Sequence, residues 1–302
     1  MKKNTLIPLL ISAVAIFMSA VLICLALLSD KKTQYYLNAT EKAAESTQKN
    51  IELKAVASDI LKNRKAQYET AVIKKEQAGT FEKYKTQPTV FLTFDDGPNE
   101  SALKIAEYLH SQGLSATFFS VCANLQSERN VEILKKITDM GFTVGLHGYY
   151  HEMKIYDGYE AFMQDLQSAQ TILKEKGIPQ ARLLRFPWTS GAAKEALYKS
   201  TGNNKAYDKI REILSQIGYS VVDFDISGND WVGGATTESI IADTLESSDY
   251  VLEKTYKAGV LLLHCTPASA EAIPAVINGL IEKGFSFDTL EENDFPYNLF
   301  GE

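Results

Sequence analysis

Two adjacent carboxylates follow the first apolar segment of the globular part of the chain. Residues 93–98 read T-F-D-D-G-P, so that Asp95 and Asp96 come directly after the segment 90–94. Neighbouring carboxylates repel each other unless a cation or a shared proton lies between them. The pair therefore indicates a bound cation, and an ordinary Asp-Gly-Pro turn is the alternative interpretation.

Three of the four histidines also stand at the ends of apolar segments. His147 and His151 belong to the segment H-G-Y-Y-H, and His264 closes the segment V-L-L-L-H. Two imidazoles four residues apart can bind one metal ion from a single turn of chain. Solvated loop histidines and a satisfied core histidine are the alternative interpretations. His110 lies in a stretch of mixed composition and is predicted to be a surface residue.

Both tryptophans of the chain lie in two further polar clusters that follow apolar segments. Residues 185–191 read R-F-P-W-T-S-G and include Trp188, and residues 225–231 read D-I-S-G-N-D-W and end in Trp231. Each cluster alone is compatible with a turn. Polar groups at the ends of five apolar segments indicate one common site.

The elements that must position these residues are predicted strands and helices, which alternate along the chain. Short apolar segments predict strands at residues 90–94, 116–121, 143–146, 182–186, 220–224 and 260–264, and amphipathic segments predict helices at residues 101–111, 128–140, 159–176, 204–217, 238–257 and 270–283. This alternation is typical of a parallel α/β domain. In such folds the catalytic groups gather at the carboxyl ends of the strands, which is where the clusters lie.

With these motifs in this order, residues from about 88 to 290 resemble the polysaccharide deacetylases of carbohydrate esterase family 4, the NodB-homology domains. Five motifs carry the resemblance: T-F-D-D-G-P, the paired histidines, R-F-P, D-W and L-L-L-H, the last of them a loose match. The resemblance implies an α/β fold of the distorted (β/α) barrel type. It also implies metal-dependent hydrolysis of acetyl groups on a polysaccharide.

The first three motifs of the family imply the metal site and the base. Asp95 would be the catalytic base, and Asp96, His147 and His151 would be the metal ligands. Arg185 would hold the carboxylate of Asp95. Two imidazoles and one carboxylate suit Zn²⁺, with Co²⁺, Mn²⁺ and Fe²⁺ as alternatives.

The last motifs imply the acid and the walls of the site. His264 would be the general acid and Asp230 would orient it, while the backbone N–H of Trp188 would lie in the oxyanion hole. The residues expected to contact substrate are Trp188, Trp231, Leu262 and Tyr149, and Tyr150 and Tyr156 are further candidates for stacking on sugar rings.

Two positions depart from the family pattern. Gly148 stands where a serine or threonine is usual after the first ligand histidine, and Cys265 stands where an aspartate is usual after the acid. The three cysteines, which include Cys24 and Cys122, have no metal-binding spacing and are interpreted as unpaired thiols, with a disulfide between Cys122 and Cys265 as the alternative.

The charge of the chain is unevenly distributed. The chain has 31 basic and 38 acidic residues. Residues 89–302 contain 17 of the basic and 30 of the acidic residues, which gives that part a net charge of −13. A strongly acidic surface repels phosphate backbones, so a nucleic acid is excluded as the expected partner.

The N-terminal residues predict an anchor and a spacer. Residues 6–28 carry no charge and would span about 34 Å as a helix, enough to cross a membrane. Lys2 and Lys3 precede them, which predicts a single-pass protein with an extracellular catalytic domain. A cleaved signal peptide followed by secretion is the alternative. The expected parts are residues 1–30 as cytoplasmic tip and transmembrane helix, 31–87 as a helical or flexible spacer and 88–302 as deacetylase domain.

The substrate is predicted from this location. An exported, tethered deacetylase lies next to its own cell wall, so the N-acetylated amino sugars of peptidoglycan are the first choice. Chitin oligomers, poly-N-acetylglucosamine and acetylated xylan are alternatives. A catalytically silent, membrane-tethered glycan-binding protein is the alternative from another class. No protein partner can be inferred.

Overall fold

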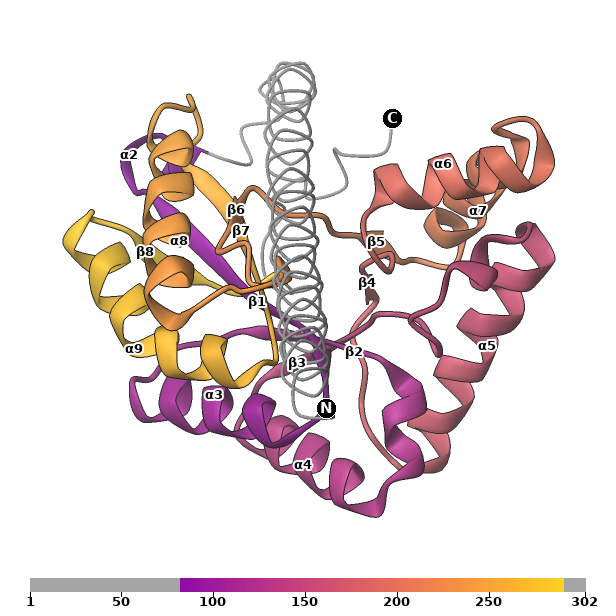
Figure 1. Ribbon diagram of the computed structural model, residues 1–302, viewed down its shortest axis with the longest axis horizontal. Helices are drawn as coiled ribbons and strands as arrows, with labels where there is room; N and C mark the ends of the chain where they lie inside the picture. The colour runs from indigo at the N-terminus through magenta and orange to yellow at the C-terminus, as the bar shows by residue number, and fades with distance from the viewer. Residues whose placement is uncertain (1–81, 291–302) are drawn as a thin grey trace, which may run out of the picture. The chain divides into compact units, whose positions relative to one another are not determined.

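The computed structural model describes residues 82–290. Eight strands form one sheet in the order β5-β4-β3-β2-β1-β7-β6, with β8 pairing with β1, and all of the pairs are parallel. The strands are β1 (Thr89–Gly97), β2 (Thr117–Ser120), β3 (Thr143–Leu146), β4 (Leu183–Leu184), β5 (Ser220–Val221), β6 (Ile226–Ser227), β7 (Ala258–His264) and β8 (Ser286–Asp288). Since β5 and β6 do not pair, the curled sheet is an open half-barrel (Figure 1).

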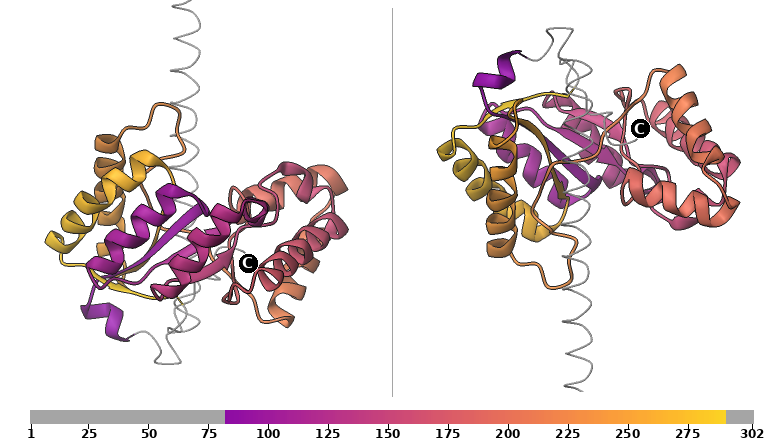
Figure 2. Two further views of the ribbon diagram at one scale, coloured as in Figure 1. Left: turned by 90° about the horizontal axis from the view of Figure 1, so that it is seen from below. Right: turned by 90° about the horizontal axis from the view of Figure 1, so that it is seen from above.

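Helices surround the outside of this sheet (Figures 1 and 2). They are α2 (Glu82–Thr86), α3 (Glu100–Ser111), α4 (Glu128–Asp139), α5 (Tyr159–Glu175), α6 (Ser190–Thr201), α7 (Lys205–Gln216), α8 (Thr237–Leu252) and α9 (Pro267–Glu282), with the 3₁₀ turns η1 (Cys122–Gln126) and η2 (Met153–Tyr156). Each of these elements contacts the next along the outside of the sheet in the order α8, α9, α3, α4, η1, α5, α7, α6.

The strands separate two apolar clusters. Alternate residues of a strand point to opposite faces. Val90 and Leu92 of β1 accordingly pack in the large cluster beneath the helices, whereas Phe91 packs in a smaller cluster on the inner face of the sheet. In β7, Leu261 packs in the large cluster and Leu262 in the inner one. The inner face continues along β1 and β7 to Asp95 and His264, so these polar groups emerge above the inner cluster.

Side-chain caps begin three helices directly after the polar loops. Asn99 accepts a hydrogen bond from the backbone of Ala102 and starts α3, Thr189 caps α6, and Thr266 caps α9. Such a cap stabilises a helix by about 1 kcal/mol and fixes its first residue. The loops that follow β1, β4 and β7 are therefore short and fixed at both ends.

The predicted alternation of strands and helices is confirmed, and the predicted barrel is observed in the form of a parallel, curled half-barrel. Five elements were not predicted from the sequence pattern, namely α6, β6, β8 and the 3₁₀ turns η1 and η2. The predicted anchor at residues 6–28 and the predicted spacer at residues 31–87 lie outside the described residues, apart from the spacer's last six. No helix within residues 82–290 has the length and apolar character needed to cross a membrane.

Candidate active site

The carboxyl ends of β1 and β7 place Asp95 and His264 side by side. The two residues are direct partners in the register of these neighbouring parallel strands. Partners in register point to the same face of a sheet, about 4.8 Å apart along the pairing direction. Asp95 is almost fully buried and His264 is partly buried. The pairing of the two longest parallel strands therefore places a carboxylate beside an imidazole, an arrangement that suits an acid and a base.

An irregularity at Asp96 brings the second carboxylate to the same place. The register of β1 with β2 shifts between Asp95 and Gly97, and Asp96 has a φ of 69°. In a regular strand the side chains of Asp95 and Asp96 would point to opposite faces, whereas a bulge re-aims one of them. As a result, Nε2 of His147 lies 3.5 Å from Oδ2 of Asp95 and 3.6 Å from Oδ1 of Asp96.

Arg185 holds the carboxylate of Asp95 from below. Its Nη1 donates to Oδ1 of Asp95 and to Oγ1 of Thr93, both at 2.8 Å. Its Nε and Nη2 donate to the carbonyls of Val222 and Asp223. Burial raises the pKa of Asp95 above its ordinary value, and the charge of Arg185 acts in the opposite direction. The arginine therefore fixes the carboxylate and leaves Oδ2 facing the site.

Asp96, His147 and His151 present one ligand atom each within 4.8 Å of one another. Nε2 of His151 lies 3.7 Å from Oδ1 of Asp96. Nδ1 of His147 lies 2.9 Å from the carbonyl of Arg185 and donates to it, which leaves Nε2 free as a ligand. Two ligand atoms around a tetrahedral zinc ion lie about 3.3 Å apart, so the observed spacings are close to those of a metal site.

The polar atoms of this trio also fit a cation. Oδ1 of Asp96 is buried and has no hydrogen-bond partner among the described residues. A buried carboxylate oxygen without a donor is unfavourable unless a cation satisfies it. Burial lowers the pKa of His147, which keeps its imidazole neutral and able to bind a metal. The residues present therefore fit a divalent metal ion.

Asp230 holds His264 by two hydrogen bonds. Oδ1 of Asp230 lies 2.8 Å from Nδ1 of His264, and Oδ2 accepts from the backbone N–H of the same residue at 2.5 Å. Burial acts to lower the pKa of His264, but the hydrogen bond and charge of Asp230 outweigh it and raise this pKa to about 9. His264 is therefore cationic at neutral pH, and its contact with Asp230 through Nδ1 leaves Nε2 available.

Ser269 is a member of this network that the sequence did not single out. It is buried in the first turn of α9 and donates from Oγ to Oδ2 of Asp230 at 2.6 Å. Its backbone N–H donates to the cap residue Thr266. The T-P pair at residues 266–267 marks the start of a helix, which is the signal that would have placed Ser269 against the end of β7.

Two exposed tryptophans stand on either side of the site. Trp188 is 41% exposed with its ring 4.5 Å from that of His151, and Trp231 is 43% exposed with its ring 5.7 Å from that of His264. Exposed indole faces of this kind are suited to contact with sugar rings. Each indole therefore lies beside a histidine of the candidate site.

The other predicted contact residues are placed differently. Tyr149 is partly buried, and its hydroxyl accepts a hydrogen bond from Gln126. Leu262 is 4% exposed and belongs to the inner cluster beneath His264. The suggestion that Tyr156 stacks on sugars is wrong, because Tyr156 is 1% exposed and its hydroxyl donates to the carbonyl of Pro187.

Residues with left-handed backbone conformation lie in the loops that form the candidate site. Within residues 82–290, the non-glycine residues with positive φ are Asp96, Trp188 and Asn229, at 69°, 66° and 50°. Each lies in the site or next to one of its residues, and Asn229 is held by a hydrogen bond to Asp243. Such backbone costs free energy in non-glycine residues and clusters at functional sites.

Comparison with known proteins places this site in a family. The family model described as polysaccharide deacetylase matches residues 82–222, which include Asp95, Asp96, both ligand histidines and Arg185. Residues 82–222 are therefore a polysaccharide deacetylase domain. The predicted family and the predicted enzyme class, a polysaccharide-deacetylase hydrolase, are thereby confirmed.

Two proteins that are similar to this domain are peptidoglycan N-acetylglucosamine deacetylases. A peptidoglycan-N-acetylglucosamine deacetylase of Bacillus cereus is 27% identical over 219 residues, which cover 72% of this chain and 74% of the relative. The catalytic domain of a peptidoglycan N-acetylglucosamine deacetylase from Eubacterium rectale has the same fold, with a TM-score of 0.58 at 23% identity over 68% of this chain and 89% of that one.

A second similar structure is that of a protein described as a pseudoenzyme, so the fold alone does not guarantee activity. A carbohydrate esterase family 4 pseudoenzyme from Bacillus anthracis matches with a TM-score of 0.54 at 20% identity, over 69% of this chain and 66% of that one. Activity of the present deacetylase domain must therefore be argued from its own residues.

Gly148, the first departure from the family pattern, adopts a conformation that disfavours a side chain. Its φ is +78°, and an added Cβ would lie 3.0 Å from both Oδ2 of Asp165 and the carbonyl of Tyr150. The usual serine or threonine would be strained here, because left-handed backbone costs about 1–2 kcal/mol in such residues.

Gly148→Ser is therefore expected to destabilise the deacetylase domain rather than to improve it. We expect a free energy of unfolding lower by about 1–2 kcal/mol, measured by urea denaturation. Gly202→Ser is a matched control for the backbone cost, since Gly202 has a φ of +75° with nothing near its added Cβ. A gain in stability or in metal affinity for Gly148→Ser would contradict this assignment.

Cys265, the second departure, is a buried neutral thiol. Its backbone N–H donates to the carbonyl of Asp95, and burial raises the pKa of the thiol well above its ordinary value. The strand end is thus tied to β1 without the carboxylate that is usual in the family. Cys122 and Cys265 are both free and buried, which confirms the prediction of unpaired thiols for these two.

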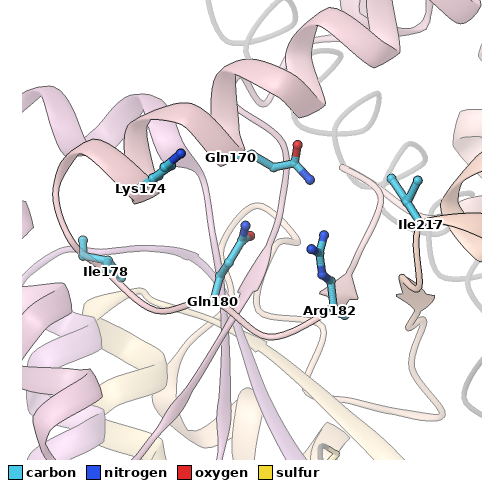
Figure 3. Close-up of a pocket in the computed structure, with 6 residues that line it drawn as sticks. All are labelled: Gln170, Lys174, Ile178, Gln180, Arg182 and Ile217. Carbon is cyan, nitrogen blue, oxygen red and sulfur yellow. The ribbon is translucent and has the colours of Figure 1, made fainter.

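A separate hollow of about 590 Å³ lies away from the chemistry (Figure 3). It is lined by Gln170, Lys174, Ile178, Gln180, Arg182 and Ile217. Arg182 immediately precedes β4, and Ile217 lies shortly before β5. The hollow is therefore at the amino ends of these strands, opposite to the carboxyl ends that carry the catalytic candidates.

Proposed function

We propose that this protein is a metal-dependent deacetylase that hydrolyses the N-acetyl groups of amino sugars in cell-wall glycan, with peptidoglycan as its substrate. The observation that carries the proposal is the pairing of Asp95 and His264 in register beside the trio of Asp96, His147 and His151. A base, an acid and a metal site in one place are what amide hydrolysis by water requires.

The metal would be held by Asp96, His147 and His151, and Zn²⁺ suits two imidazoles and one carboxylate. When bound, it supplies a Lewis acid that polarises the acetyl carbonyl and lowers the pKa of water. Buried, neutral His147 is already in its metal-binding form. His151 is partly exposed at the open side of the site.

Asp95 acts as the base in this proposal. Its Oδ1 is occupied by Arg185, and its Oδ2 faces the trio and can take a proton from the attacking water. The raised pKa of Asp95 makes the carboxylate a stronger base than an exposed aspartate. The water oxygen forms a bond to the acetyl carbon as its proton moves to Asp95.

Trp188 supplies a donor for the oxyanion in this proposal. Its left-handed backbone lies between β4 and the capped start of α6, and its N–H meets no acceptor within the described part of the chain. A fixed donor that points at developing negative charge contributes about 10²–10³ in rate.

His264 acts as the acid. As the C–N bond breaks, its Nε2 gives a proton to the departing nitrogen, and Asp230 stabilises the cation before transfer. The products are acetate and a free amino sugar. Trp188 and Trp231 would hold the flanking sugar rings, and the predicted roles of Leu262 and Tyr149 remain part of this proposal.

The division between metal ligands and other site residues can be tested directly. Asp96→Ala and His147→Ala are each expected to abolish stoichiometric zinc binding, because each removes one of three ligands. Metal content after gel filtration, determined by plasma mass spectrometry, is the measurement. His110→Ala is the matched control, since His110 is exposed on α3 and should keep one zinc ion per chain. Retention of zinc by both ligand variants would contradict the site.

The location of the protein is also a proposal. An anchor formed by residues 6–28 would place the domain outside the cell, next to its wall, with residues 31–87 as spacer and 88–302 as deacetylase domain. Membrane fractionation of the full chain, with protease added to intact cells, tests this arrangement. Recovery in the soluble secreted fraction would support the cleaved signal peptide instead.

The substrate is tested with a panel of glycans. We expect the purified, zinc-loaded protein to release acetate from peptidoglycan fragments faster than from chitin oligomers, poly-N-acetylglucosamine or acetylated xylan. A preference for one of the other three would replace peptidoglycan as the substrate. Binding of glycan with one zinc ion and no release from any of them would support the silent glycan-binding protein.

A further inference from the structure

The two ligand histidines are joined by a short loop, residues 147–151, which we call the ligand loop. Only three residues separate His147 from His151, so the path of these peptides sets the distance between the two imidazoles. His147 itself is fixed, because its backbone N–H donates to Ser120 and its ring donates to Arg185. The position of His151 depends on what holds the peptides between them.

A carboxylate from α5 binds the amides of the ligand loop. The backbone N–H of Tyr149 donates to Oδ2 of Asp165 at 2.7 Å, and the N–H of Tyr150 donates to Oδ1 of the same residue at 2.9 Å. Asp165 is 7% exposed and belongs to the middle of a 17-residue helix. Each carboxylate oxygen thus has its own amide.

The carbonyls of the ligand loop are held from the other side. The N–H groups of Cys122 and Ala123, in η1, donate to the carbonyls of Gly148 and Tyr149 at 3.1 and 2.9 Å. Within residues 82–290, Asp165 is the side chain that binds the loop's amides. The loop is therefore clamped between the backbone of η1 and one carboxylate.

The backbone conformation of Gly148 allows the hydrogen bonds between Asp165 and the ligand loop. Left-handed backbone at Gly148 turns the following amides towards α5, and its missing side chain leaves room for Oδ2 of Asp165, which an added Cβ would approach to 3.0 Å. A glycine here and an aspartate 17 positions later therefore form one arrangement. It holds the ligand loop without the hydroxyl that is usual at position 148.

The charge of Asp165 makes these bonds strong. Hydrogen bonds to an ionised carboxylate are about twice as strong as those between neutral groups. Burial raises the pKa of Asp165, and the two amide hydrogen bonds counteract it. A neutral amide at this position would present an NH₂ group to one of the two loop amides, which would leave that amide without an acceptor.

We propose that Asp165 is a positioning residue that sets the metal affinity of the site by fixing the ligand loop. The proposal rests on the metal site proposed above, because it assigns to Asp165 the positioning of one of its ligands, His151. Groups that orient metal ligands in this way typically contribute 10–100-fold to affinity. Asp165 itself is too far along the chain from the motifs to be recognised with them.

The test compares zinc affinities of full-length variants by competition with a chromogenic chelator. Asp165→Asn is expected to raise the zinc dissociation constant about 10–100-fold. Thr236→Ala is the matched control, because it also removes a side-chain acceptor from a backbone amide, at the start of α8, and leaves the ligand loop untouched. It should lower the melting temperature and leave the dissociation constant within about threefold of the original.

Two outcomes would overturn the proposal in different ways. Zinc binding by the original protein with a dissociation constant unchanged in Asp165→Asn would remove the role of Asp165 alone. Absence of zinc binding by the original protein would remove the metal site as well. If Asp165→Asn does not fold, Asp165→Glu keeps the charge and displaces the oxygens, and an unchanged dissociation constant in that variant would also reject the proposal.

Discussion

Asp95→Asn is expected to lower kcat by about 10³-fold while one metal ion stays bound per chain. Asparagine has the size of aspartate and its oxygen can still accept the hydrogen bond from Arg185, but its amide cannot take a proton from water. The proposed ligands are other side chains, so the metal should remain. Steady-state kinetics and metal analysis of the same preparation measure both effects.

The contrast with the ligand variants makes this prediction specific. Asp95 and Asp96 are adjacent in the sequence, but the irregularity in β1 gives their side chains different surroundings. Loss of metal in Asp95→Asn to the same extent as in Asp96→Ala would show that the two carboxylates share the ligand role. Near-normal turnover by Asp95→Asn would show that another group is the base.

His264→Ala is expected to lower kcat by about 10²–10⁴-fold, because the departing nitrogen would lose its proton donor. The pH dependence adds a more specific expectation. The acid works only while protonated, so activity should fall as the pH rises through the pKa of His264, about 9. Measurement of kcat/KM from about pH 6 to about pH 10, a range that includes this pKa, would locate the fall in activity on the alkaline side.

Asp230→Asn tests the cause of that raised pKa. The carboxylate of Asp230 stabilises the imidazolium, so its neutralisation lowers the pKa of His264 and moves the alkaline limb to lower pH. Ser269→Ala removes a single hydrogen bond to Asp230 and should lower activity less. An alkaline limb that stays in place in Asp230→Asn would contradict the role of this ion pair.

The strands and helices that could be predicted are those long enough to show a period. The segments 90–94 and 260–264 became parts of β1 and β7, and the amphipathic segment 128–140 became α4. By contrast, β6 has two residues and β8 three, which is too short for alternation to appear. Their pairing depends on β7 and β1, and not on their own sequence.

The candidate site could be predicted to the extent that its residues belong to compact motifs. Asp96, His147 and His151 were predicted as one ligand set, and the structure brings them together. The bulge at Asp96 could not be predicted, because it is a property of the pairing of β1 with β2. Asp165 and Ser269 lie on helices, and each reaches the site only through the packing of its helix against a strand end.

Burial was the least predictable property. Tyr156 and Trp188 both looked like aromatic residues of a loop, but Tyr156 packs against Phe162 and Phe186 whereas Trp188 remains exposed. The difference arises from the positive φ of Trp188 and from the packing of η2 on α5 and α6. Neither of these features has a signal in the local sequence.

The central claim is that this site hydrolyses the N-acetyl amide of cell-wall glycan. The most direct measurement quantifies acetate and free amino groups together after zinc-loaded protein has acted on peptidoglycan fragments, beside Asp95→Asn. The account predicts equal amounts of acetate and amine from the original protein and neither from the variant. Acetate without amine would indicate an ester substrate, and no acetate from a protein that binds one zinc ion would contradict the claim.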